Sequence, residues 1–191
     1  MKYSSKHTIW SMKNKTLKMT SADFKAMGKG KKASDSSFIQ KAGVYIAIDP
    51  GTKTGIAMKY KGEKKFLLIE TMKIHKALEY IKEQADFYLI PIHIILEDAR
   101  MNAGLPKEFR KEGREQGAGS IKRDCVIIID FLDDLIKESP LGRITYSLAD
   151  PRKNKMRHKF SDDPDFFMKQ TGWHKKGTQH EREAASYLFG L

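Results

Sequence analysis

The order of apolar segments in the middle of the chain constrains its fold more than any other feature. Val44–Asp49, Gly55–Tyr60 and Lys65–Met72 are predicted to be β-strands, because each is apolar and bounded by turn-forming residues. Their short connections predict an antiparallel meander. Ile74–Leu89 has apolar residues at helical spacing, and the apolar segment His93–Leu96 follows it. A helix between two strands indicates a crossover, so the fourth strand is expected to lie parallel within the same sheet.

The remainder of the chain adds helices and one more strand. Ser120–Lys137 is the clearest helix, Arg143–Leu148 alternates like a strand, and a last helix is predicted from Gln179 to the C-terminus. Residues 101–118 and 150–162 are predicted to be loops, because the first is polar and glycine-rich and the second is strongly basic. The sequence therefore predicts an α/β fold, with a mixed sheet covered by helices.

Residues 1–40 are predicted to be a basic N-terminal extension and linker, ahead of one domain over residues 41–191. The extension has nine lysines against two aspartates, and the whole chain has a net charge of +12. This balance favours a polyanionic partner, most commonly nucleic acid. No apolar run approaches the roughly 20 residues needed to span a bilayer. An anionic membrane surface is the weaker alternative partner, because no strongly amphipathic basic helix is present in the sequence, so no membrane partner is expected. The single cysteine, Cys125, has apolar helical neighbours, which indicates a reduced thiol in a cytoplasmic protein.

Three acidic residues occupy positions suited to binding a metal ion. Asp49 ends the first strand, Glu97 ends the fourth, and Glu183 lies in the first turn of the last helix, three residues after His180. Adjacent strands lie about 4.8 Å apart, so Asp49 and Glu97 can share a hard cation, and a helix laid across them can add Glu183. Mg²⁺ prefers oxygen ligands. Two such ions about 4 Å apart can promote phosphodiester hydrolysis.

Each of these residues also has an ordinary structural interpretation. Asp49 stands directly before a Pro-Gly pair, which is typical of a turn. Glu97 could take part in an exposed salt bridge at a strand end, and Glu183 could be a solvated residue stabilised by the helix N-terminus. His180 is expected to share a helix face with Glu183, whereas Glu181 is expected to face solvent.

Taken together, four motifs resemble the RuvC-type Holliday-junction resolvases of the RNase H-like nuclease superfamily. The motifs are Ile46-Ala47-Ile48-Asp49-Pro50-Gly51 with Gly55 four residues on, Ile94-Ile95-Leu96-Glu97-Asp98, the glycine-rich helix entry Gly117–Asp124 that is similar to phage members, and Thr171-Gly172-Trp173 followed by His180-Glu181-Arg182-Glu183-Ala184-Ala185. The resemblance covers about residues 43–191. It implies an RNase H-like mixed five-stranded sheet flanked by helices.

The same resemblance implies a function and a site. Asp49, Glu97 and Glu183 would bind Mg²⁺, for which Mn²⁺ could substitute, and His180 would be a further ligand or a general acid–base group. The family usually has aspartate where this chain has Glu183. The implied activity is two-metal cleavage of Holliday junctions and related branched DNA by a homodimer. A phage-encoded protein would act in the bacterial host cytoplasm.

DNA contacts are predicted for basic residues of the segments that follow Glu97 and the fifth strand. The predicted DNA-binding residues are Lys107, Arg110, Lys111, Arg114, Lys122, Arg123, Arg152, Lys153, Lys155, Arg157 and Phe160. The basic residues are expected to contact phosphates, and Phe160 is expected to stack on a base. The alternative is that residues 150–162 are simply a solvated basic loop.

Other functions are compatible with parts of the pattern. An RNase H-like nuclease that processes ribosomal RNA precursors shares the first-strand motif, but it lacks the basic insertions and the C-terminal motif. Actin-like and sugar-kinase ATPases share an Asp-x-Gly-Thr motif, but they need two such domains, for which 191 residues are too few. A non-catalytic DNA-binding relative that lost its metal site is also possible. Metal-dependent cleavage separates it from a nuclease.

Overall fold

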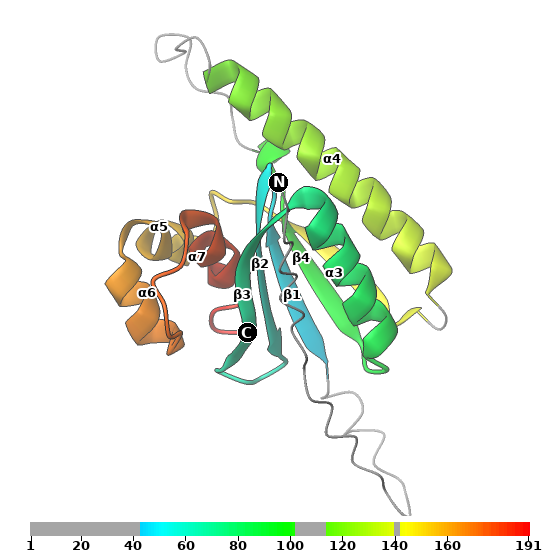
Figure 1. The fold of residues 1–191 in the computed structure, drawn as a ribbon, viewed down its shortest axis with the longest axis horizontal. Coiled ribbons are helices and arrows are strands. Elements are labelled where there is room, and N and C mark those ends of the chain that lie inside the picture. The colour runs from blue at the N-terminus through cyan, green and yellow to red at the C-terminus, as the bar shows by residue number, and fades with distance from the viewer. Residues whose placement is uncertain (1–42, 102–113, 140–141) are drawn as a thin grey trace, which may run out of the picture. The chain divides into compact units, whose positions relative to one another are not determined.

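The computed structural model describes residues 43–101, 114–139 and 142–191 (Figure 1). The strands are β1 (Val44–Asp49), β2 (Lys53–Tyr60), β3 (Phe66–Lys73), β4 (Ile92–Glu97) and β5 (Ile144–Ala149). The helices are α3 (Ile74–Phe87), α4 (Arg114–Glu138), α5 (Lys155–Asp162), α6 (Pro164–Thr171) and α7 (Gln179–Ser186), with a 3-10 turn η1 (Ala99–Met101). The basic extension predicted for residues 1–40 lies outside the described residues and stays a prediction.

The five strands form one mixed sheet in the order β3-β2-β1-β4-β5. β1 pairs with β2, and β2 with β3, in antiparallel fashion, whereas β1 pairs with β4, and β4 with β5, in parallel. The parallel pairing of β1 with β4 follows from the crossover through α3. This topology confirms the predicted fold class, an RNase H-like mixed five-stranded sheet flanked by helices.

Alternation along the strands builds a separate apolar core on each face of the sheet. Ile46 of β1 packs in a core with residues of α3 and α4. Ala47 of β1 and Ile95 of β4 belong to the opposite core, which includes residues of α5, α6 and α7. Figure 1 shows these two groups of helices on opposite sides of the sheet. Because successive side chains of a strand alternate between faces, Asp49 and Glu97 lie on the face covered by α5–α7.

The segment predicted as a basic loop at residues 150–162 is largely helix α5, so that prediction was wrong. Asn154 caps the helix, because its side chain accepts hydrogen bonds from the backbone N–H groups of Met156 and Arg157. Phe160 and Met156 pack in the core beneath the helix. The Asn154 cap and the burial of Met156 and Phe160 therefore stabilise a helix here, although the segment is rich in basic residues. At the other end of the chain, α7 ends at Ser186 and does not continue to the C-terminus.

Helix α4 begins inside the segment predicted as a loop at residues 101–118 and has 25 residues. Cys125, Ile128 and Leu132 are buried on the face that packs toward the sheet. Val126 and Ile127 are more than 40% exposed on its outer side. No helix within the described ranges is both long and apolar enough to cross a membrane.

Candidate metal centre

The carboxylates of Asp49, Glu97 and Glu183 converge in one cluster, and each offers an oxygen within 4.8 Å of the others. Asp49 ends β1 and Glu97 ends the neighbouring strand β4, whereas Glu183 comes from α7. All three residues are at least 95% buried. The structure thus brings together three acidic residues that lie up to 134 positions apart in the sequence. Neither the turn interpretation of Asp49 nor the solvated interpretation of Glu183 accounts for this burial.

Helix α7, which carries Glu183 into the cluster, begins with a capping box formed by Thr178 and Glu181. The Thr178 side chain accepts a hydrogen bond from the Glu181 backbone N–H, and the Glu181 carboxylate accepts one from the Thr178 backbone N–H. This capping box satisfies two of the donors that a helix start leaves unpaired. Glu181 is therefore buried, and the expectation that it faces solvent was wrong.

Gly55 of β2 lets the first turn of α7 approach the sheet. A Cβ atom at this position would lie 2.1 Å from the His180 carbonyl oxygen and 2.5 Å from its carbonyl carbon. Gly55 pairs with Asp49 across the β1–β2 ladder, so the close approach occurs beside the carboxylate cluster. The glycine of the first-strand motif is therefore required by backbone packing.

Gly55→Ala should destabilise the protein by about 1–3 kcal/mol, the usual cost of overpacking, and should displace His180 from Asp49. Denaturant unfolding measures the first effect. Gly119→Ala on α4 is the matched control, because a Cβ at Gly119 meets no atom within 4 Å, and alanine favours a helix. Equal unfolding free energies for the two variants would contradict the packing role of Gly55.

His180 binds Asp49 directly. Its Nδ1 lies 2.6 Å from the Asp49 Oδ2, and its side chain is 41% exposed. The hydrogen bond to Asp49 raises the pKa of His180 above its usual value. An imidazole in this position can orient the carboxylate and can donate a proton to a group on its solvent side.

The two glutamates are surrounded by hydrogen-bond donors, of which the sequence analysis singled out only Arg157, and that residue as a DNA contact. Glu97 Oε2 accepts hydrogen bonds from Arg157 Nε at 3.0 Å and from Tyr187 Oη at 2.9 Å. Glu183 Oε2 accepts from Arg157 Nη2 at 2.5 Å. Glu183 Oε1 accepts from Ser161 Oγ at 2.8 Å and from the Gln179 side-chain amide at 2.7 Å.

The cluster suits a hard divalent cation. Burial raises the pKa of Asp49, and burial together with the Asp49 charge raises the pKa of Glu97 to about 7. Buried carboxylates this close together oppose one another's ionisation, and a bound cation relieves that opposition. Three carboxylate donors match the oxygen ligands that Mg²⁺ and Mn²⁺ prefer. Asp49, Glu97 and Glu183 are therefore the residues that would hold such an ion.

These pKa directions predict how stability depends on pH without metal. The folded protein binds protons at Glu97, Asp49 and His180 more tightly than the unfolded chain does, since all three pKa values are raised. Stability contributed by protonation is present below the unfolded pKa values and is lost as pH rises through the folded ones. Glu97 alone should contribute a loss on the order of 3 kcal/mol between about pH 4.5 and pH 7.

In EDTA, the Tm should therefore fall as the pH rises from about 5 to about 8, and saturating Mg²⁺ should reverse the trend. Thermal unfolding followed by circular dichroism across a pH series measures both. Glu97→Gln should flatten the profile in EDTA. A Tm that rises with pH in EDTA would contradict the raised pKa values.

Arg182 belongs to the same motif as His180 and Glu183 and has a structural role that the sequence analysis did not assign. Its guanidinium donates to the backbone carbonyls of Phe160, Ser161 and Gly177, each at 2.7 Å. These bonds join the end of α5 to the loop before α7. Arg182 therefore fixes the two helices that supply Arg157 and Glu183.

Two arginines at the ends of β4 and β5 have the same local geometry. Asp98 accepts from Arg100 Nε at 2.7 Å and Nη2 at 2.8 Å, and Asp150 accepts from Arg152 Nε at 2.9 Å and Nη2 at 2.8 Å. Both turns follow strand ends that are in register. The arginine side chains are 39% and 58% exposed. Arg152 is among the predicted DNA contacts, and Arg100, which has the same Asp-x-Arg spacing, is not.

The other predicted DNA contacts are distributed over several elements. Arg123, Lys153 and Lys155 are exposed and Lys122 is half-buried. Outside the described part of the chain are Lys107, Arg110, Lys111 and the side chain of Arg114. Arg157 lies in the carboxylate cluster, where its guanidinium is largely buried.

The prediction that Phe160 stacks on a base was wrong. Phe160 is fully buried, and its ring packs against those of Phe166, Phe167 and Phe189. A side chain at the centre of a core of this kind cannot reach a nucleotide without unfolding α5. The aromatic residue instead anchors the helix that carries Arg157.

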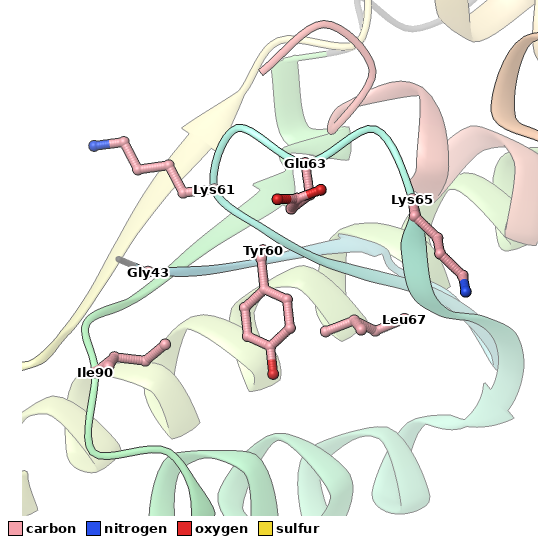
Figure 2. Close-up of a pocket in the computed structure, with 7 residues that line it drawn as sticks. All are labelled: Gly43, Tyr60, Lys61, Glu63, Lys65, Leu67 and Ile90. Atoms are coloured by element: carbon pink, nitrogen blue, oxygen red, sulfur yellow. The ribbon is translucent and has the colours of Figure 1, made fainter. Parts of the chain in front are cut away.

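A cavity of about 470 Å³ lies away from the cluster, near the start of β1 (Figure 2). Its lining includes Gly43, Tyr60, Leu67 and Ile90, with lysine and glutamate side chains at its margin. Gly43 precedes the first residue of β1, whereas Asp49 is its last. The cavity and the carboxylates are therefore at opposite ends of one strand.

No protein-family model matches the sequence, and no curated protein matches it. Among solved structures, the chain is similar to RuvC of T. thermophilus in complex with a Holliday junction substrate. The TM-score is 0.45 and the sequence identity is 13%, over 75% of this chain and 89% of that chain. A likeness at this level carries no weight for activity. The fold assignment depends on the strand order and directions described above.

Proposed function

We propose that this protein is a divalent-metal-dependent endonuclease that cleaves branched DNA, with the Holliday junction as its substrate. The observation that carries the proposal is the convergence of Asp49, Glu97 and Glu183 within 4.8 Å on an RNase H-like sheet. Buried acidic clusters are costly unless they bind a cation. The sequence motifs that contain these residues resemble those of the RuvC-type resolvases, which supports the choice of substrate.

The chain's own residues have separable roles in this proposal. Asp49, Glu97 and Glu183 hold Mg²⁺, and the chemistry that the ion supplies when bound is activation of water and stabilisation of the leaving oxygen. His180 orients Asp49 through its 2.6 Å hydrogen bond and can move a proton at its exposed edge. Exposed basic residues, among them Arg100 and Arg152, hold the DNA backbone through phosphate contacts.

We further propose that the protein acts as a homodimer, since a junction has two equivalent strands to cut. Val126 and Ile127 are exposed on the outer side of α4, and Ile121 is exposed near its N-terminal end, and these apolar side chains support a contact between copies. The buried thiol of Cys125 fits a reducing compartment such as the cytoplasm. Sedimentation equilibrium of the full chain measures the oligomeric state.

Parallel cleavage assays test the function directly. The full chain with Mg²⁺ is incubated with a four-way DNA junction, a linear duplex of the same sequence and a structured RNA. We expect paired cuts in the junction, weak or no cleavage of the duplex, and loss of cleavage in EDTA. Selective cleavage of the RNA would favour the RNA-processing alternative. Junction binding without metal-dependent cleavage would favour a non-catalytic DNA-binding protein.

A further inference from the structure

Arg157 places a positive charge among the carboxylates that would hold the metal ion. Its Nε donates to Glu97 Oε2 and its Nη2 donates to Glu183 Oε2, so one guanidinium bridges β4 and α7. The side chain is only 21% exposed. An arginine guanidinium stays charged in proteins, so Arg157 is a permanent cation inside the cluster.

The arginine takes up oxygen atoms that a metal ion would need. Glu97 Oε2 is shared between Arg157 and Tyr187. Glu183 has hydrogen bonds at both oxygens, from Arg157 at Oε2 and from Ser161 and Gln179 at Oε1. Charge-assisted hydrogen bonds of this kind are stronger than neutral ones. Three of the roughly four acceptor positions of the Glu183 carboxylate are therefore occupied, and a cation that binds there competes with the guanidinium for the same negative charge.

The backbone that carries Arg157 is held in place. Asn154 accepts a hydrogen bond from the Arg157 backbone N–H, and its side-chain amide donates to Ser186 Oγ of α7 at 2.7 Å. Phe160 anchors the same helix in the core. Because α5 is fixed at these points, release of the carboxylates requires rotation of the Arg157 side chain alone, which needs no movement of the helix.

We propose that Arg157 is a built-in counter-ion, which holds Glu97 and Glu183 together before metal binds and which a divalent cation must displace. The metal part of this inference rests on the proposed function. The arginine lowers metal affinity, because part of the binding free energy is used to break its two hydrogen bonds. The site is thereby kept assembled at low metal concentration, with part of its buried negative charge compensated by the guanidinium.

Mn²⁺ affinity tests this role without relying on catalysis. Isothermal titration with Mn²⁺ at one fixed pH of about 8.5 compares the wild type with Arg157→Gln. Glutamine keeps a hydrogen-bond donor but removes the charge. We expect Mn²⁺ to bind the variant about tenfold or more tightly, since a charge-assisted bond no longer competes. Lys169→Gln, an exposed site on α6 with the same loss of charge, should bind like the wild type.

A second measurement on the wild type keeps the inference testable if Arg157→Gln fails to fold. The Nε–H signal of Arg157 in an NMR spectrum should shift and exchange faster with water when Mg²⁺ saturates the site. Unchanged or weaker Mn²⁺ affinity in folded Arg157→Gln would overturn the role of Arg157. So would an Nε–H signal that is insensitive to bound Mg²⁺.

The same data separate this inference from the proposed function. A wild type that binds Mn²⁺ and cuts junctions, beside a variant with no gain in affinity, contradicts only the counter-ion role. Absence of Mn²⁺ binding in both proteins contradicts both proposals. Mn²⁺ binding in Arg157→Gln together with none in the wild type would support the counter-ion role most strongly.

Discussion

Asp49→Asn should abolish metal-dependent cleavage while leaving junction binding close to that of the wild type. The substitution keeps the size of the side chain and an oxygen that can accept the hydrogen bond from His180, but it removes the charge that holds the cation. Loss of a group that only orients a ligand costs roughly 10- to 100-fold in metal affinity. Loss of a ligand's charge should cost more than ~100-fold. DNA binding persists, because it depends on basic residues and phosphates.

Single-turnover cleavage of a four-way junction and a gel-shift titration measure the two quantities separately. Asp86→Asn is the matched control, since Asp86 is exposed on α3, which lies on the other face of the sheet. The Asp86→Asn substitution makes the same change in charge away from the carboxylates. The variant should cleave the junction at the wild-type rate. Turnover at the wild-type rate in Asp49→Asn would remove Asp49 from the site and would end the case for a nuclease centred on β1.

The second large effect is expected at Glu183, where the sequence departs from the resolvase motif. Glu183→Gln should abolish cleavage, because it removes the third carboxylate and leaves Arg157 paired with Glu97 alone. In the wild type, Ser161, Gln179 and Arg157 all donate hydrogen bonds to the Glu183 carboxylate. The glutamine side chain replaces one accepting oxygen with an N–H₂ group, which cannot accept from these donors. A loss of stability is therefore expected together with the loss of activity.

Glu183→Asp should retain measurable cleavage, because it keeps the charge with a side chain one methylene shorter. Mn²⁺ should support this variant better than Mg²⁺ does, since Mg²⁺ demands near-ideal octahedral geometry. The comparison requires cleavage rates with each metal and thermal unfolding of each variant. Glu83→Gln, an exposed position on α3, controls for the change of charge. Normal cleavage by Glu183→Gln would show that α7 contributes no third carboxylate to the site.

The Glu183→Gln variant also bears on the proposed counter-ion role of Arg157, in which the arginine and the metal ion compete for the same oxygens. In Glu183→Gln the guanidinium keeps its bond to Glu97 and loses its charged partner on α7. If Arg157 holds the cluster together, this loss should separate α7 from β4 even when no metal is present. Proteolysis of the metal-free variant would then be faster within α7 than in the wild type.

The strands of the sheet and two of its acidic residues could be predicted from local pattern. Val44–Asp49 was predicted with the bounds that the structure has. Alternation within β1 and β4 determines that Asp49 and Glu97 share a face, since each is the last residue of a strand whose even-numbered residues are in the opposite core. The crossover helix between the strands made their parallel pairing predictable as well.

The sequence of helix α5 contains a local helix pattern, but the many basic residues of the segment led to the prediction of a loop. Asn154 is a favourable helix cap, and Met156 and Phe160 have the i, i+4 spacing of a buried helix face. Five basic residues between Arg152 and Lys159 led to a prediction of a solvated loop. An eight-residue helix has too few turns for its apolar face to stand out, so the helix and the burial of Phe160 were missed.

The sequence by itself determined the order of the elements and the acidic ends of β1 and β4, because strand alternation and turn chemistry act between near neighbours in the chain. Only the tertiary structure decided which groups surround the carboxylates. Arg157 meets Glu97 across 60 residues and Glu183 across 26, and Tyr187 meets Glu97 across 90. Such contacts depend on where α5 and α7 pack on the sheet. That position is determined by the burial of Phe160, the approach of α7 to Gly55 and the hydrogen bonds of Arg182, and no local sequence pattern records their combined geometry.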